Sequence, residues 1–199
     1  MKPEVLVAHV KVPVPVRLVR STLVQSSLGF LRARGHYDQY IEVLEPQHRE
    51  AILGSLAPAW MPVEILLAHY AACDAMHLPL PERIALGEGV GERVQGAFMK
   101  TIIQGARSVG VTPFTLLARF DALWERVFVG GSIEVTRLGP KDASVEFLHT
   151  LVPRFEYCRT AFAGIFRAGI KVSGGRTAYI TPIAYDDRAD RFALRAAWV

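Results

Sequence analysis

The spacing of hydrophobic and polar positions changes near residue 130. Before it, apolar side chains recur every three or four residues, the spacing of helices that bury one face. After it, apolar and polar side chains alternate in most segments, as they do in strands. The pattern therefore predicts a helical first half and a ββαββ second half.

The first half is expected to hold one strand and a series of helices. Residues 4–12 are rich in valine and indicate a strand, which Pro13 and Pro15 end. The helices are expected over 17–34, 37–44, 46–55, 62–76, 92–107 and 113–128, with a further helical stretch from Pro81.

Particular residues mark two helix ends. Gly35 fits the C-terminal cap of the first helix, because glycine adopts the left-handed conformation that such caps use. Thr112 and Pro113 are typical of a helix start, with threonine as the cap and proline in the first turn. We expect that helix to run to about Phe128.

Three closely spaced glycines interrupt the helical stretch that begins at Pro81. Gly87, Gly89 and Gly91 each cost a helix about 1 kcal/mol relative to alanine. The stretch should therefore break, kink or pack closely on another helix at this point.

The second half is expected to form two hairpins that flank one helix. Gly169 should end that helix, and Pro182 should place its strand at an edge or a bulge. The strands are expected over 132–138, 143–149, 176–185 and 191–198, and the helix over 154–168.

These elements predict an α+β fold in one domain, residues 1–199. A mainly helical part, residues 1–130, should pack on a four-stranded antiparallel sheet within residues 131–199. The broad apolar faces of helices 17–34 and 113–129 exceed what one small sheet can cover, which favours a homodimer.

The composition is that of a globular protein, with 51% hydrophobic and 21% charged residues among 199. The formal net charge is +4, and the basic residues are scattered from Arg17 to Arg195 without a run of five like charges. Nucleic-acid-binding proteins usually concentrate their charge on a stripe or an arm, so we expect no nucleic-acid partner.

The sequence is expected to belong to a cytoplasmic protein. The start, Met1 to His9, lacks the apolar stretch of a signal peptide, and no uncharged apolar run is long enough for a membrane span. Cys73 and Cys158 lie within predicted helices among apolar neighbours, so both should be reduced and partly buried.

Several short segments carry a family resemblance. The chain is similar in four segments to a large paralogous family of unknown function in myxobacteria. These segments are residues 34–51, residues 60–64 (Trp-Met-Pro-Val-Glu), residues 112–124 and the terminal strand 190–198. Residues 131–199 resemble the ββαββ core of four-vinyl-reductase domains, which are related to haem–nitric-oxide-binding sensor domains and TRAPP-complex subunits.

The resemblance implies two possible ligands, and the sequence departs from the pattern of both. Some four-vinyl-reductase domains bind zinc through a cysteine where Cys158 stands, but the last hairpin here has no cysteine, so we expect no metal. The haem-binding relatives hold the haem propionates with Tyr-x-Ser-x-Arg, which is missing here, so we expect no cofactor.

One helix carries candidate ligands at regular spacing. His69, Cys73 and His77 lie four residues apart on one face, which is half of a possible metal site. No further ligand is evident, and the spacing also fits a core helix with a polar edge. His69, between Leu66 and Tyr70, is also a candidate axial ligand for haem.

Aromatic side chains indicate a possible apolar pocket between the helices and the sheet. Ligand sites are mostly apolar with a few polar anchors, although an aromatic stripe at helical spacing also fits an ordinary core. The candidate pocket residues are Trp60, His69, Tyr70, Phe98, Phe120, Trp124 and Tyr157.

No catalytic motif is present in the sequence. The Gly-x-Ser-x-Gly motif is absent, and the glycine-rich residues 173–176 follow a helix, the reverse of a phosphate-binding loop. We therefore expect a non-enzymatic sensor or adaptor module in signalling that binds a small hydrophobic molecule or a protein partner. The alternatives are a haem-binding or enzymatic domain that uses the helix around His69, and a structural scaffold with a filled core.

Overall fold

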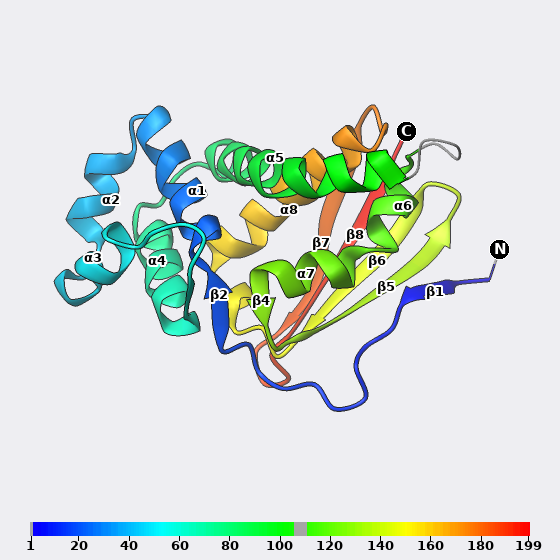
Figure 1. Ribbon diagram of the computed structural model, residues 1–199, viewed down its shortest axis with the longest axis horizontal. Coiled ribbons are helices and arrows are strands. Elements are labelled where there is room, and N and C mark those ends of the chain that lie inside the picture. The colour runs from blue at the N-terminus through cyan, green and yellow to red at the C-terminus, as the bar shows by residue number, and fades with distance from the viewer. Residues whose placement is uncertain (1, 106–110) are drawn as a thin grey trace.

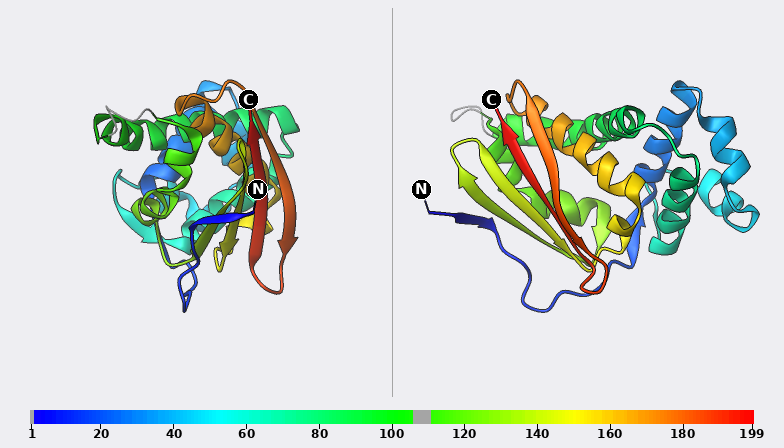
Figure 2. Two further views of the ribbon diagram at one scale, coloured as in Figure 1. Left: turned by 90° about the vertical axis from the view of Figure 1, so that its right-hand side faces the viewer. Right: turned by 180° about the vertical axis from the view of Figure 1, so that it is seen from behind.

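The structure is a computed structural model that describes the backbone of residues 2–105 and 111–199, and their side chains except at 95–105, 183 and 184. Long helices cover one face of an antiparallel sheet, and a group of shorter helices extends beyond its end (Figures 1 and 2). This arrangement confirms the α+β fold class.

The first half is helical, as predicted. A small sheet in the order β3-β2-β4 joins three short strands: β2 (Leu18–Arg20), β3 (Trp60–Pro62) and β4 (Phe128–Val129). The helices are α1 (Ser21–Ala33), α2 (Tyr37–Val43), α3 (Pro46–Leu53), α4 (Val63–Ala75), α5 (Leu80–Gly105), α6 (Pro113–Leu117) and α7 (Phe120–Val127).

The second half confirms the predicted ββαββ order. Its elements are β5 (Ser132–Gly139), β6 (Asp142–Leu148), a short 3-10 turn η1 (Val152–Arg154), α8 (Glu156–Val172), β7 (Ala178–Asp186) and β8 (Arg191–Trp198). Every pairing in the sheet is antiparallel.

The main sheet has five strands, one more than predicted, in the order β1-β5-β6-β8-β7. The added strand is β1 (Glu4–Val7), which pairs with β5. The sequence predicts a strand over 4–12, longer than the one observed, and does not predict its partner, because the pairing joins distant parts of the chain. β7 lies at the other edge with a register shift after Pro182, as that proline predicts.

Two predicted helix boundaries are wrong. Leu18–Arg20 is strand rather than helix, because these residues pair with the distant strands β3 and β4. Gly169 does not end α8, which continues to Val172. The glycine that caps the helix is instead Gly174, two residues after its end, whose φ of +96° accompanies hydrogen bonds from the Gly174 and Gly175 amides back to the last turn.

The two predicted caps are confirmed, but one helix is divided. Gly35 has a φ of +77° after α1, and Thr112 forms a capping box with Thr115. The helix expected to run to Phe128 is interrupted at Arg119, where φ is −119° and ψ is 17°. No glycine or proline marks this break, so the local sequence does not reveal it.

The glycine-rich stretch of α5 packs closely on α8, one of the three predicted outcomes. A Cβ atom on Gly87 would lie 2.0 Å from the carbonyl oxygen of Ala161, and one on Gly164 would lie 2.2 Å from that of Ile84. The helix runs through this region without a break. The two backbones therefore touch where neither helix can carry a side chain.

The apolar faces of α1 and α7 are buried inside the chain. Leu28 and Leu31 of α1 are fully buried, and Leu123 and Trp124 of α7 are each 6% exposed. These faces therefore need no second copy of the chain to cover them. The homodimer stays a prediction. Across residues 2–105 and 111–199, every helix falls short of the length and apolarity that crossing a membrane requires.

Gly87→Ala should destabilise the protein by about 1–3 kcal/mol or more, although alanine favours helices by about 1 kcal/mol. The new methyl group meets backbone of α8, which cannot turn away. Gly89→Ala is the control, since its methyl group meets the movable ring of Phe30. Urea unfolding measures both, and a Gly87→Ala protein as stable as the parent contradicts the packing argument.

Candidate ligand-binding cavity

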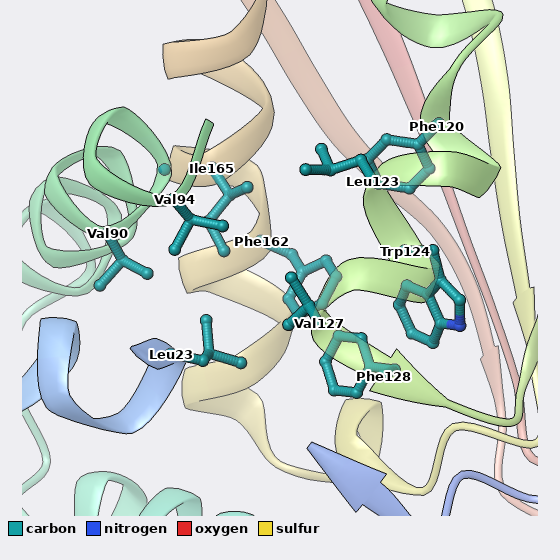
Figure 3. A pocket seen from close by; sticks show the side chains of 11 residues that line it. Leu23, Val90, Val94, Phe120, Leu123, Trp124, Val127, Phe128, Phe162 and Ile165 are labelled. Carbon is teal, nitrogen blue, oxygen red and sulfur yellow. The ribbon is translucent and has the colours of Figure 1, made fainter. Parts of the chain in front are cut away.

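A small cavity of about 50 Å³ lies between the helical part and the ββαββ part. Figure 3 shows the surrounding side chains, which come from both halves of the chain. Its lining consists of Leu23 of α1, Val90, Gly91 and Val94 of α5, Phe120, Leu123, Trp124 and Val127 of α7, Phe128 of β4, and Phe162 and Ile165 of α8.

The cavity is built by helical spacing and by one tight helix contact. Side chains three or four residues apart on α7 point the same way, so Phe120, Leu123 and Val127 reach the cavity together. Beside it, a Cβ atom on Gly91 would lie only 2.9 Å from the Cα atom of Ile165. The close approach of α5 to α8 at this glycine therefore sets one wall.

The lining offers no polar group to a ligand among the described residues. Its one polar side-chain atom is Nε1 of Trp124, which donates to the carbonyl oxygen of Gly130 at 2.9 Å. The indole ring stacks on Phe128 with ring centres 4.1 Å apart. A buried water needs two to four polar partners, so this space suits apolar atoms rather than water.

A separate buried cluster surrounds His69 of α4. The imidazole is fully buried, with Nδ1 at 2.8 Å from the Tyr40 hydroxyl of α2 and Nε2 at 2.9 Å from the Ser27 hydroxyl of α1. The hydroxyl of Tyr157 on α8 lies 3.5 Å from that of Ser27. These contacts join α1, α2, α4 and α8 through their side chains.

Burial keeps this cluster neutral. It lowers the pKa of His69 to about 3 and raises the pKa of the Cys73 thiol, whose Sγ lies 3.7 Å from Nε2 of His69. The pKa values of Tyr40 and Tyr157 are also raised, again chiefly by burial. The neutral imidazole donates one hydrogen bond and accepts another, so its role is to hold helices together.

The structure divides the seven candidate pocket residues among different places. Phe120 and Trp124 line the cavity. His69, Tyr70 and Tyr157 belong to the polar cluster, with ring centres of Tyr70 and Tyr157 5.8 Å apart. Trp60 lies 37% exposed at the surface, and the side chain of Phe98 lies outside the described residues.

The candidate set also lacks several aliphatic side chains of the cavity. Leu23, Val90, Val94 and Ile165 line it, but in the sequence they look like any core residue. The one usable signal was the glycine-rich stretch of α5, which indicated a close helix contact next to the cavity.

Cys158 is buried in α8, and burial raises the pKa of its thiol well above its usual value. Both cysteines are free. Within the described part of the chain, no three His, Cys, Asp or Glu side chains gather where they could hold a metal ion. The Asp190 carboxylate accepts hydrogen bonds from the Leu151 amide.

Comparison with known proteins shows what this fold is like. No family model matches the chain, and no curated protein does. The Fe(II) unliganded H-NOX protein from K. algicida matches with a TM-score of 0.65 at 6% identity, over 90% of this chain and 96% of that one. A mutant of the H-NOX protein from T. tengcongensis matches with a TM-score of 0.54 at 11% identity, over 90% and 97%.

A third match, an H-NOX protein from S. oneidensis, has a TM-score of 0.54 and 11% identity over 90% of this chain and 96% of that one. The chain therefore has the fold of H-NOX, or haem–NO-binding, domains. This confirms the predicted relation of folds. The more specific likeness to a myxobacterial family stays a prediction.

His69 should make stability depend on pH. The unfolded histidine takes up a proton near pH 6.5 and the folded one only near pH 3, so the unfolded state binds more protons in between. Stability should therefore fall as the pH falls from 6.5, by up to about 1.4 kcal/mol per pH unit.

His69→Gln should flatten this part of the pH profile, because glutamine does not titrate. Urea unfolding between pH 7 and pH 4.5 measures it, and His77→Gln, at an exposed histidine, is the matched control. Equal slopes in His69→Gln and the parent protein would show that the buried imidazole is not the cause.

Proposed function

We propose that this chain is a non-enzymatic sensor or adaptor module that binds a small apolar molecule in the cavity between its two halves. The observation that carries the proposal is the lining: it is apolar throughout, and its one polar atom already has a partner. Ligand pockets are mostly apolar and lie between structural units, which supports this assignment.

The position of the cavity suits a sensor. Val90 and Val94 of α5 lie on one side of it, and Phe120, Leu123 and Trp124 of α7 lie on the other (Figure 3). A ligand would contact both sides at once and would stabilise the arrangement in which they fit it best. At about 50 Å³ the cavity holds only a few non-hydrogen atoms, whereas drug-sized ligands occupy about 300–1,000 Å³.

The described residues do not fit a haem, although haem distortion has been probed in one structural neighbour from the H-NOX family. No described side chain of the cavity can ligate iron, and both ring nitrogens of His69 are already hydrogen-bonded. The cavity is also much smaller than a site for a drug-sized ligand. We therefore assign no step to haem.

Small apolar probes should stabilise the protein. Xenon, benzene and butan-1-ol are tested in thermal unfolding, and the melting temperature should rise with probe concentration because only the folded state has the cavity. Val90→Phe fills the cavity and should abolish the shift, with Val90→Leu as a milder version.

Val12→Phe is the matched control, since it adds the same atoms at a valine that is 82% exposed. It should leave the shift unchanged. If none of the probes raises the melting temperature of the parent protein, the structural-scaffold alternative replaces this proposal.

The purified protein, mixed with one equivalent of haemin, should show no Soret band of a specific complex, because no described side chain is placed to ligate the iron. Absorption spectroscopy measures this, with His69→Gln as the comparison. A stoichiometric Soret band that His69→Gln removes would contradict the assignment and restore the haem alternative.

A further inference from the structure

A surface groove of about 460 Å³ lies directly beside the cavity. The two hollows share four lining side chains: Leu23, Val94, Leu123 and Val127. These four side chains face both hollows, so a molecule in the groove touches the same side chains that line the cavity. The groove volume falls within the range of about 300–1,000 Å³ that is typical of small-molecule sites.

Three arginines line this groove, from three different elements. They are Arg20 of β2, Arg93 of α5 and Arg126 of α7. None of the nine described residues that line the groove is acidic. The groove therefore gathers positive charge without supplying an acidic residue in its own wall.

A cation–π contact holds one of these arginines, and the side chain of a second lies close to α1. The guanidinium carbon of Arg20 lies 3.9 Å from the ring centre of Trp60, a cation–π contact. A Cβ atom on Gly29 would lie 3.4 Å from Nη1 of Arg93, so this side chain extends along α1. A guanidinium presents its donors in a planar fork that matches a carboxylate, so the pair gains two parallel hydrogen bonds.

A groove with arginines beside apolar side chains that it shares with the cavity suits a ligand with two unlike ends. We propose that the groove and the cavity together bind an amphipathic anion, the carboxylate of a short- or medium-chain fatty acid. Its carboxylate lies on Arg20 and Arg93, and its tail packs on Leu23 and Leu123 with its end in the cavity. This inference rests on the proposed function and names the chemical class of its ligand.

Calorimetric titration of the full chain tests it with three probes at pH 7.5. Octanoate carries both the head and the tail, octan-1-ol carries the tail alone, and acetate carries the head alone. Octanoate should bind at least about tenfold more tightly than octan-1-ol, and acetate should show no binding. Raising the salt concentration should weaken octanoate binding and leave octan-1-ol unchanged.

Arg93→Gln removes one charge from the groove at an exposed position, so the protein should still fold. It should raise the dissociation constant of octanoate about tenfold and leave that of octan-1-ol unchanged. Arg188→Gln is the matched control, because Arg188 is exposed in the turn between β7 and β8 and should not affect either probe.

The outcomes separate this inference from the proposed function. Equal binding of octanoate and octan-1-ol, unaffected by salt and by Arg93→Gln, overturns the anion site and leaves an apolar ligand. Failure of both probes to bind, together with no stabilisation by xenon or benzene, overturns both proposals.

Discussion

The close packing of α5 on α8 is the contact on which the rest of the structure depends. Gly87 and Gly164 let the two backbones approach so closely that a methyl group on either would strike a carbonyl oxygen. The contact joins the helical half to the helix at the centre of the ββαββ half. Because α5 is held at this distance, Val90 and Val94 face the cavity and Arg93 reaches the groove.

α8 links the two buried regions that differ most in chemistry. Phe162 and Ile165 face the apolar cavity, whereas Tyr157, near the start of the same helix, joins the polar cluster around His69. In the cluster each hydrogen-bonding group of the imidazole has a partner, and burial keeps the pKa of His69 at about 3. The cluster therefore holds the helices together. The apolar cavity is the part of the interior in which we propose that a ligand binds.

The fold and the chemistry of the interior give different information about function. The chain has the fold of H-NOX domains at 6–11% sequence identity, a level at which only the backbone arrangement is comparable. One fold can host many functions, because function depends on the chemistry of the site. The site that we propose here consists of an apolar cavity and a groove with three arginines.

The sequence alone was enough to determine the ββαββ order of the second half and the position of the Thr112 cap, and it narrowed the glycines of α5 to a break, a kink or a close helix contact. Each depends on local spacing or on the conformational preference of a single residue. Only the tertiary structure decided that Leu18–Arg20 is a strand, that the helix breaks at Arg119, and that Trp60 lies apart from Trp124. These features depend on partners distant in the chain, and local patterns carry no information about which distant segments meet.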